Sequence, residues 1–497
     1  MTVKNKKSKN SPKTRPPIVV VLGHVDHGKS SLLEAVKDLK ITEKEAGGIT
    51  QRIGAYMISH KGKEITFIDT PGHEAFSKMR SRGADIADVG ILVVAADEGV
   101  KKQTKEAIQC LKDSKIPFVV AINKIDKKQA DIEKTKQDLA KEQIFLESYG
   151  GEVPSANISC KNKEGIDELL ELVGLVAEME GLEMEEVDGA EGVVIESIRD
   201  PKKGTVINLL IKKGTLRKGD FIGTEHSYGK IRTIQDFLGK EKEEAGESTP
   251  VQITGIKDCL SAGEDFFVFE KIEDAKRFVS KREIKEKNIL SKEQKTVNII
   301  LKVDGVSSLE AVESSLSKIP QEEVAVKIIK ADIGNITESD IEWAKTEDTK
   351  IIAFNVSTEK SAEKMAIQEG VKIEYFDIIY ELIDFVKKTI EGMLEPELIR
   401  EEIGKIKILV VFRTQKNRQI LGGKIIRGEA VKGALVEIQR DKEKIGEGKI
   451  VNLKKEEKDM EKISENEEIG MLLESKTKAE EEDVIVLYKE KTVNKTL

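Results

Sequence analysis

The feature that most constrains this chain is the run Gly23-His-Val-Asp-His-Gly28-Lys29-Ser30, which follows an apolar, β-branched segment and opens a helix-period segment. A glycine-rich loop between a strand and a helix directs backbone N–H groups and the helix N-terminus toward one point, which suits phosphate oxygens. Lys29 adds a point charge there, and the Ser30 hydroxyl can ligate Mg²⁺. The loop residues Gly23, His24, Val25, Asp26, His27, Gly28, Lys29 and Ser30 therefore predict a nucleotide phosphate site on an α/β fold.

The surrounding residues, 16–180, alternate between apolar β-branched runs and helix-period segments. Strands are predicted at Ile18–Leu22, Ile65–Ile68, Val89–Ala95 and Phe118–Ile122, and helices at Ser31–Leu39, Glu74–Gly83, Thr104–Lys112, Ile132–Glu147 and Asp167–Ala177. This alternation is typical of a mainly parallel sheet covered by helices. Ligands of such sheets bind beyond the carboxyl ends of the strands, where the predicted loop lies.

A second motif, Asp69-Thr70-Pro71-Gly72-His73, follows the predicted strand Ile65–Ile68. Asp69 can hold Mg²⁺ through water, and Gly72 lets the backbone approach a γ-phosphate because no Cβ intervenes. His73 can order the attacking water, since phosphoryl transfer needs positioning more than covalent chemistry. We predict His73 as the catalytic residue, and the alternative is a capped surface histidine.

Base recognition is predicted from Asn123-Lys124-Ile125-Asp126, which follows the strand Phe118–Ile122. The Asp126 carboxylate can accept hydrogen bonds from guanine N1–H and N2–H₂, a pair that adenine does not offer. Asn123 can reach the O6/N7 edge, and Lys124 can lie over the ring. Ser159-Cys160-Lys161, after a short strand predicted at Val153–Ile158, would supply a backbone N–H to the guanine carbonyl. The nucleotide is therefore predicted to be GTP.

The rest of the chain divides by composition into a β-barrel (186–280), an α/β domain (293–375), a connecting helix (376–397) and a second β-barrel (398–490). Gly214-Thr-Leu-Arg-Lys-Gly219 in the first barrel is echoed by Gly428-Glu-Ala-Val-Lys-Gly433 in the second, which hints that the barrels are related. The apolar stripe of the helix packs on its own domain or makes the helix a rigid spacer, and Pro396 ends it.

Composition excludes several classes of protein. No apolar stretch is long enough to span a bilayer, and the basic N-terminus lacks the apolar core of a signal peptide. Three separated cysteines form neither a disulfide framework nor a zinc spacing. His24 and His27 suggest a metal, but their place in the phosphate loop argues against it. We expect a cytoplasmic protein.

Residues 1–15 carry six basic residues and no acidic one, so we predict a disordered basic tail. The tail either touches RNA or only aids solubility. The formal net charge of −8 does not exclude RNA as a partner, because local basic patches supply non-specific affinity.

Together these motifs resemble those of the translational GTPases. Gly47-Gly-Ile-Thr-Gln-Arg-Ile-Gly-Ala-Tyr56 and Asp69-Thr-Pro-Gly-His-Glu-Ala-Phe76 look specifically like the bacterial translation initiation factor 2 family, from about residue 16 onward. The resemblance implies that Thr50 is the switch threonine that binds Mg²⁺ and γ-phosphate, with Ser30 and Asp69 as the other Mg²⁺ contacts. It also implies that Val25 and Ile49 form a hydrophobic gate over the water site.

Members of that family bring formyl-methionyl initiator tRNA to the small ribosomal subunit and promote joining of the large subunit, and hydrolysis of GTP to GDP and phosphate then releases them. The resemblance therefore implies a ribosome-activated GTPase that contacts both subunits and ribosomal RNA, acts as a monomer, needs no membrane and reads the tRNA with its last barrel. No arginine in the chain is an obvious arginine finger, so the activator should be the ribosome.

The sequence departs from the family in three respects: a long N-terminal region is reduced to the basic tail, glycine and isoleucine stand at positions 423 and 469 where many members have cysteine, and acidic residues crowd the last barrel. The last two put the formyl-methionine pocket in question. Rival interpretations are a tRNA-carrying elongation factor, the eukaryotic-type initiation relative and a ribosome-binding scaffold with a structural nucleotide site. The Gly47–Tyr56 segment argues against the first, and the intact catalytic set argues against the last.

Overall fold

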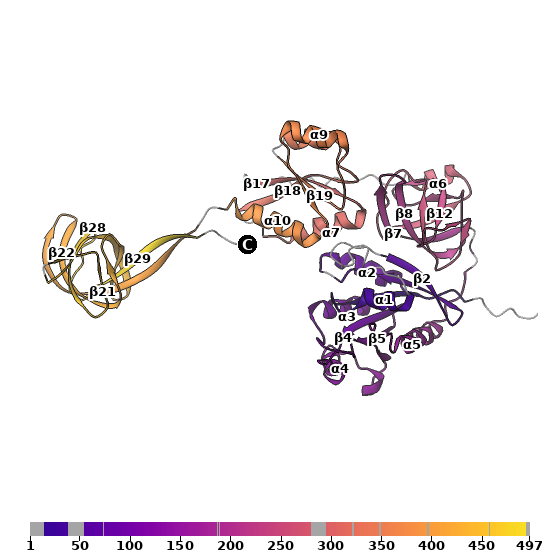
Figure 1. The fold of residues 1–497 in the computed structure, drawn as a ribbon, viewed down its shortest axis with the longest axis horizontal. Helices are drawn as coiled ribbons and strands as arrows, with labels where there is room; N and C mark the ends of the chain where they lie inside the picture. Colours follow the sequence, from indigo (N-terminus) through magenta and orange to yellow (C-terminus); the bar gives the residue numbers. More distant parts are fainter. Residues whose placement is uncertain are drawn as a thin grey trace, which may run out of the picture. The chain divides into compact units, whose positions relative to one another are not determined.

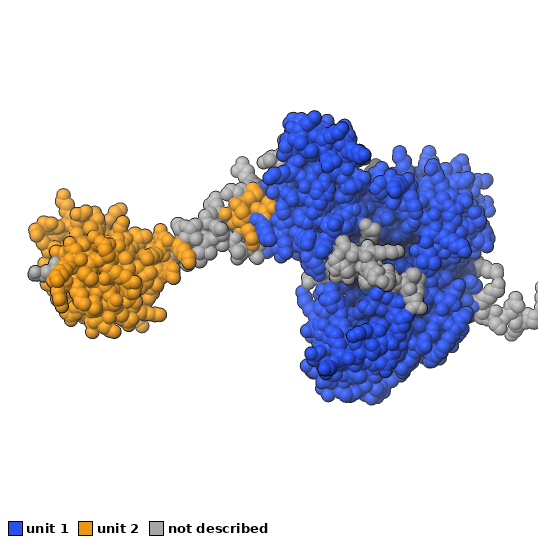
Figure 2. Space-filling model, viewed as in Figure 1, with its two compact units in different colours: residues 1–388 blue, residues 389–497 orange. Residues whose placement is uncertain are grey.

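The structure is a computed structural model that describes residues 14–37, 54–72, 74–185, 187, 189–279, 295–320, 323–346, 349–394, 397–456 and 458–493. It divides into two compact units, residues 1–388 and 389–497, which Figure 2 colours blue and orange. Ile49, Thr50, His73, Pro396 and most of the basic tail lie outside the described residues.

The first domain of the chain is a six-stranded sheet in the order β2-β3-β1-β4-β5-β6, in which β2 alone runs antiparallel. Its elements are β1 (Ile18–Gly23), α1 (Lys29–Lys37), β2 (Gly54–His60), β3 (Lys63–Asp69), the 3₁₀ turn η3 (Glu74–Phe76), α2 (Ser77–Ile86), β4 (Val89–Ala95), α3 (Lys102–Ser114), β5 (Phe118–Asn123), α4 (Ile132–Lys141), η4 (Glu147–Tyr149), β6 (Ser155–Asn157) and α5 (Ile166–Met179). Figure 1 labels the five α-helices and the strands β2, β4 and β5. The predicted parallel α/β architecture is confirmed.

The sheet is buried on both faces because helices cover both. Strands β1 and β4 are buried at every position, which explains their continuous apolar sequences. Leu32 and Leu33 of α1 and Leu169, Leu170 and Val173 of α5 share one core with every second residue of these strands. Helices α2 and α3 contact each other and β1. The loops at the carboxyl ends of the strands are therefore held on a rigid base.

Three details of this domain differ from the prediction. The helix expected at Ile132–Glu147 ends at Lys141, because Gln143 takes a left-handed φ of 63° and the chain continues as a loop that buries Ile144 and Leu146. The antiparallel edge strand β2 was not predicted. Arg15, which the sequence placed in the tail, is held by two hydrogen bonds to Asp88, at 2.7 and 2.6 Å.

The second domain is an eight-stranded sheet in the order β11-β10-β16-β7-β8-β15-β12-β13. Among the described strands its end strands β11 and β13 are not paired with each other, so the expected barrel is a half-barrel. Strands of only two or three residues at both ends offer too few ladder hydrogen bonds to close the ring. The elements are β7 (Ala190–Asp200), β8 (Gly204–Gly214), β9 (Leu216–Arg217), β10 (Phe221–Gly223), β11 (Tyr228–Lys230), β12 (Thr233–Gln235), β13 (Glu241–Lys242), β14 (Glu244–Ala245), β15 (Pro250–Thr254), β16 (Asp265–Phe269) and α6 (Ile272–Val279).

A parallel four-stranded sheet, β18-β17-β19-β20, forms the third domain. Its elements are β17 (Lys295–Val303), α7 (Val306–Ser317), β18 (Val324–Ile333), α8 (Glu338–Thr346), β19 (Lys350–Phe354), α9 (Lys360–Glu369), β20 (Ile373–Phe376) and α10 (Ile379–Glu391). Helix α10 buries Ile379, Leu382 and Val386, and its Phe385 ring lies 5.4 Å from that of Phe376 at the end of β20. Of the two alternatives, the stripe therefore packs on its own domain.

The second unit is a closed antiparallel barrel. Its sheet runs β24-β29-β21-β22-β28-β25-β26, and an additional pairing of β24 with β25 closes the ring. The elements are β21 (Glu397–Gln415), β22 (Arg418–Gly428), β23 (Ala430–Val431), β24 (Leu435–Arg440), β25 (Glu443–Lys455), β26 (Lys458–Met460), β27 (Lys462–Ile463), β28 (Glu468–Ser475) and β29 (Val484–Val493). Alternate residues fill its core.

The short repeat seen in the sequence has the same local conformation in both places. Gly214 and Gly219 have φ values of 74° and 97°, and Gly428 and Gly433 have values of 70° and 81°. Each first glycine precedes a two-residue strand that pairs in a separate two-stranded sheet, β9 with β14 and β23 with β27. These left-handed positions favour glycine, which explains why the spacing repeats.

Candidate functional site

The predicted phosphate loop connects β1 to α1 and is closely supported by its neighbours. A Cβ on Gly23 would lie 2.4 Å from the Val93 carbonyl oxygen, and one on Gly28 would lie 2.2 Å from Asn123 Nδ2. Both glycines also have positive φ values. Only residues without a side chain fit this path, so the two fixed glycines of the motif are explained by steric contact as well as by conformation.

Lys29 at the start of α1 turns back over this loop. Its Nζ donates to the His24 carbonyl at 2.7 Å, and a Cβ on Gly72 would lie 2.4 Å from Nζ. The ammonium therefore lies between the phosphate loop and the Asp69–Gly72 segment. Burial lowers the pKa of Lys29 to about 8, against the raising effect of the Asp69 carboxylate, and an anionic phosphate nearby would raise that pKa again.

The Asp69–Gly72 segment begins where β3 ends. Asp69 and Thr70 are fully buried, and the Thr70 hydroxyl donates to the Val21 carbonyl of β1 at 2.9 Å. The Asp69 carboxylate raises the pKa of Lys29, which opposes the effect of burial. A buried carboxylate at this strand end, opposite the start of α1, is a donor set that suits Mg²⁺. Pro71 and Gly72 continue the segment toward His73.

The predicted guanine residues line one cavity of about 550 Å³, together with Asp26 and Gly28 of the phosphate loop. Asn123, Lys124, Asp126, Cys160 and Lys161 all border it. The Ser159 hydroxyl donates to Asp126 Oδ1 at 2.7 Å, and this hydrogen bond is the main reason that the pKa of Asp126 is lowered. Residues from two distant motifs therefore meet around a volume suited to a nucleotide.

Asn123 also has a structural part that the motif did not predict. Its Nδ2 donates to the His27 carbonyl at 2.9 Å, and its Oδ1 accepts from the Cys160 N–H at 3.3 Å. Asn123 thus connects the phosphate loop to the loop that follows β6 through these two hydrogen bonds.

Gln103 on α3 is a site residue that sequence reasoning missed. Its Oε1 accepts from the Val25 N–H at 3.0 Å, which holds the middle of the phosphate loop. A glutamine on a solvent-facing helix belongs to no motif and carries no spacing signal, so only the folded arrangement reveals it. Val25 itself, one of the predicted gate residues, lies close to Gly72: a Cβ on that glycine would be 3.0 Å from the Val25 nitrogen.

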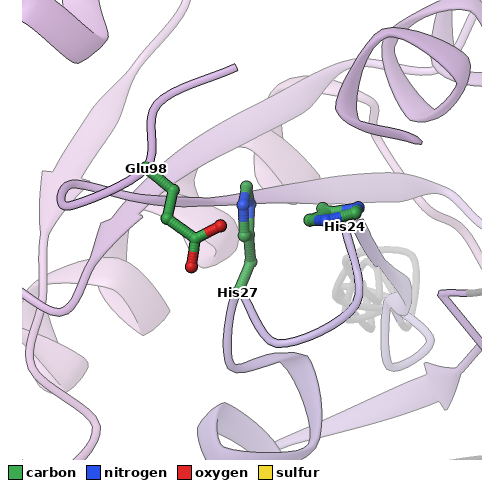
Figure 3. A group of neighbouring side chains, drawn as sticks. All are labelled: His24, His27 and Glu98. Atoms are coloured by element: carbon green, nitrogen blue, oxygen red, sulfur yellow. The ribbon is translucent and has the colours of Figure 1, made fainter. Parts of the chain in front are cut away.

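His24, His27 and Glu98 gather behind the loop, where their ligand atoms lie within 4.8 Å of one another (Figure 3). Burial, with a smaller effect of His24, lowers the pKa of His27 to about 3, so its imidazole is neutral at physiological pH. Glu98 lies 3.6 Å from Lys124 and 3.9 Å from Lys101. Since the carboxylate already has cationic partners, the grouping gives no reason to replace the phosphate-loop interpretation.

Comparison with known protein families agrees with this arrangement. Residues 14–178 match the family model of the elongation factor Tu GTP binding domain, residues 189–269 that of elongation factor G domain 2, and residues 271–387 that of translation-initiation factor 2. The fold and the site therefore define a translational GTPase.

The chain is 40% identical to translation initiation factor IF-2 of Anoxybacillus flavithermus and of Halalkalibacterium halodurans, over 95% and 97% of this chain and 68% and 69% of those proteins. It is 39% identical to the same factor of Pelotomaculum thermopropionicum, over 97% of this chain and 51% of that protein. The chain belongs to the translation initiation factor IF-2 family.

The chain spans about half the length of the first curated relatives that it matches, 51% and 44%. Among solved structures, GDP-bound aIF5B from Aeropyrum pernix is similar at 27% identity with a TM-score of 0.47, over 96% of this chain and 92% of that one. None of the helices in the described ranges combines the length and apolarity needed to cross a membrane.

Proposed function

We propose that this chain is a GTP-dependent translation initiation factor. It binds formyl-methionyl initiator tRNA to the small ribosomal subunit and promotes joining of the large subunit, and ribosome-activated hydrolysis of GTP to GDP and phosphate releases it. One observation carries the proposal. The phosphate loop, the Asp69–Gly72 segment and the Asp126–Ser159 pair all lie at the carboxyl ends of strands of one mainly parallel sheet.

In this proposal the nucleotide phosphates bind the loop N–H groups and Lys29, whose ammonium already donates to the His24 carbonyl across the loop. Mg²⁺ would be held by Ser30, by Thr50 in the GTP state and by Asp69 through water, and it would neutralise developing charge on the phosphates. Asp126, oriented by Ser159, accepts from guanine N1–H and N2–H₂. Asn123 joins the two loops that flank the base and reaches the O6/N7 edge of guanine, and Lys124 lies over the ring.

Hydrolysis is assigned to His73, which would orient the attacking water while Val25 and Ile49 screen the site until the ribosome is engaged. Without a group such as an arginine finger, related GTPases turn over on the order of 10⁻⁴ per second. The last barrel would read the formyl-methionyl end of the tRNA. We further propose a monomer that acts in the cytoplasm and contacts ribosomal RNA mainly by shape and phosphate.

The test is GTP hydrolysis with 30S subunits and initiator tRNA, before and after addition of 50S subunits, with and without the formyl group. A burst on 50S addition that is stronger with formylated tRNA is expected. A burst indifferent to formylation would leave the GTPase but remove formyl recognition from the last barrel. No burst would overturn the proposal in favour of a ribosome-binding scaffold.

A further inference from the structure

An arginine lies beside the nucleotide site without belonging to any of its motifs. Arg80 is on α2, and its side chain is 3% exposed. Its Nη1 donates to the carbonyl oxygens of Pro71 and Gly72, at 3.3 and 3.2 Å, and its Nη2 donates to Glu106 Oε2 on α3 at 2.9 Å. The two carbonyls are those that immediately precede His73 in the chain.

Burying a guanidinium is costly unless charge and hydrogen bonds compensate. Here Glu106 supplies the opposite charge, and its side chain is 32% exposed, so one side of the pair remains near water. The planar guanidinium suits the task because its donors point in fixed directions, whereas an ammonium is a point charge on a flexible stem. The Arg80 side chain thus connects the Pro71–Gly72 segment to α2, on which it lies, and to α3, which carries Glu106.

The donors of Arg80 that bind these carbonyls are not directed at a nucleotide. This distinguishes Arg80 from an arginine finger, whose guanidinium neutralises charge on the transferred phosphoryl group. The two hydrogen bonds to these carbonyls therefore act on the reaction through the backbone that Arg80 holds. Misplacing a reacting group by about 1 Å can cost on the order of 10²-fold in rate, so a fixed loop before His73 has a catalytic value.

We propose that Arg80, anchored by Glu106, is a positioning residue for GTP hydrolysis: it fixes the Pro71–Gly72 backbone, from which the chain continues directly to the proposed catalytic residue His73. This inference rests on the proposed function. A purely structural arginine would stabilise the packing of α2 on α3 but would leave the rate per bound GTP unchanged, and the two roles therefore predict different measurements.

The test compares Arg80→Met, Arg80→Lys and Glu106→Gln with Arg82→Gln as the matched control. Arg82 lies two residues further along the same helix and forms a bidentate pair with Glu310 at 2.8 and 3.0 Å, outside the nucleotide site. For each full-length variant we would measure the affinity for a fluorescent GTP analogue, kcat and KM of ribosome-stimulated hydrolysis, and the thermal midpoint.

Arg80→Met is expected to lower kcat on the order of 10²-fold with GTP affinity unchanged within about threefold. Arg80→Lys should recover part of the rate, Glu106→Gln should lower it less, and Arg82→Gln should stay near wild type. A loss of GTP affinity as large as the loss of kcat would overturn the proposal, as would an unchanged kcat.

Amide hydrogen exchange of the peptide that spans residues 69–76 gives a second, activity-independent readout in the nucleotide-free chain. Exchange should be faster in Arg80→Met than in Arg82→Gln when each variant is measured at the same number of degrees below its own thermal midpoint. Equal exchange in both variants would overturn the role of Arg80. If the wild-type chain showed no ribosome-stimulated hydrolysis, the proposed function would fail, while this comparison would still decide whether Arg80 holds the loop.

Discussion

The nucleotide domain and the last barrel use their strands in different ways. In the nucleotide domain, candidate residues stand at the last positions of β1, β3 and β5 and on the loops that follow these strands and β6, and most other residues of β1, β3 and β5 are buried. In the barrel, the two positions where this chain departs from its family lie within strands, where Gly423 on β22 pairs with Ile469 on β28. The residue type at such a loop position is restricted mainly by the ligand, whereas the residue type in the middle of a strand is restricted first by packing.

This difference has a physical origin. Parallel strands bring all their carboxyl ends to one edge, so residues far apart in sequence converge there whatever the loops contain. An antiparallel barrel has no such common edge, and its residues alternate between core and surface along every strand. The candidate residues of the first region therefore form short motifs in the sequence. Surface residues of the barrel are dispersed along several strands and form no such motif.

The largest effect is expected from His73→Ala, which tests whether the segment after β3 carries the catalytic residue. If His73 orders the water, ribosome-stimulated turnover should fall by up to about 10⁴-fold, and GTP affinity should hold because the phosphate loop is intact. Rapid phosphate-release measurements with programmed ribosomes check this. Unchanged turnover would remove His73 from the catalytic role.

Base recognition supplies the next effect, through Asp126→Asn. Loss of two charge-assisted hydrogen bonds at about 2 kcal/mol each should weaken GTP binding on the order of 10³-fold. Xanthosine triphosphate should bind the variant better than GTP does, because its C2 oxygen can accept from the new amide. Equilibrium titrations with both nucleotides make the comparison.

Ser159→Ala is the matched control for that experiment, because it removes only the hydrogen bond that orients Asp126. It should weaken GTP binding by about tenfold or less. A larger effect than that of Asp126→Asn would place base recognition on the loop after β6 instead.

A buried carboxyl group away from both regions gives a pH-dependent prediction. Glu196 on β7 is buried, and its Oε1 accepts from the Ser307 N–H at 3.3 Å. Burial raises its pKa from 4.5 to about 7, with Asp304 adding to the effect and Ser307 opposing it. The folded state therefore binds a proton more tightly, so this contribution to stability is present below about pH 4.5 and is lost as the pH rises through 7.

Glu196→Gln, which mimics the protonated group, should be about as stable as wild type at pH 5 and more stable by about 3 kcal/mol at pH 8. Urea unfolding of both proteins across this range measures the difference. A difference that does not change with pH would show that Glu196 does not titrate in this window.

The smallest effect concerns the barrel and decides whether Gly423 is a packing position. A Cβ there would lie 2.7 Å from both the Ile406 side chain and the Lys407 carbonyl oxygen. Gly423→Ala or Gly423→Cys should therefore destabilise the barrel by about 2 kcal/mol. The adjacent Gly422→Ala meets only the ring of Phe412, which is 68% exposed and can move.

Thermal unfolding of the three glycine variants completes this comparison, with Gly422→Ala expected near wild type. If Gly423→Cys were neutral and strengthened binding of formylated tRNA, the position would belong to the ligand surface, and the contrast between the two regions would weaken.

Much of the nucleotide domain could be predicted because its signals are local. The strands β1, β3, β4 and β5 follow from apolar β-branched runs, and the phosphate loop from two glycines whose φ values and close contacts admit no side chain. The helix expected to reach Glu147 could not be predicted to end at Lys141, because its apolar period continues through Ile144 and Leu146 into a buried loop.

The sequence by itself determined the parallel α/β domain, the motifs around the nucleotide and the repeated glycine turns, since each depends on neighbours within a few residues. Only the tertiary structure decided that Asn123 joins two loops, that Gln103 and Arg80 support the site from α3 and α2, and that Gly423 has no room for a side chain. These roles depend on contacts between segments far apart in the chain, and such contacts leave no spacing or period in the sequence from which they could be inferred.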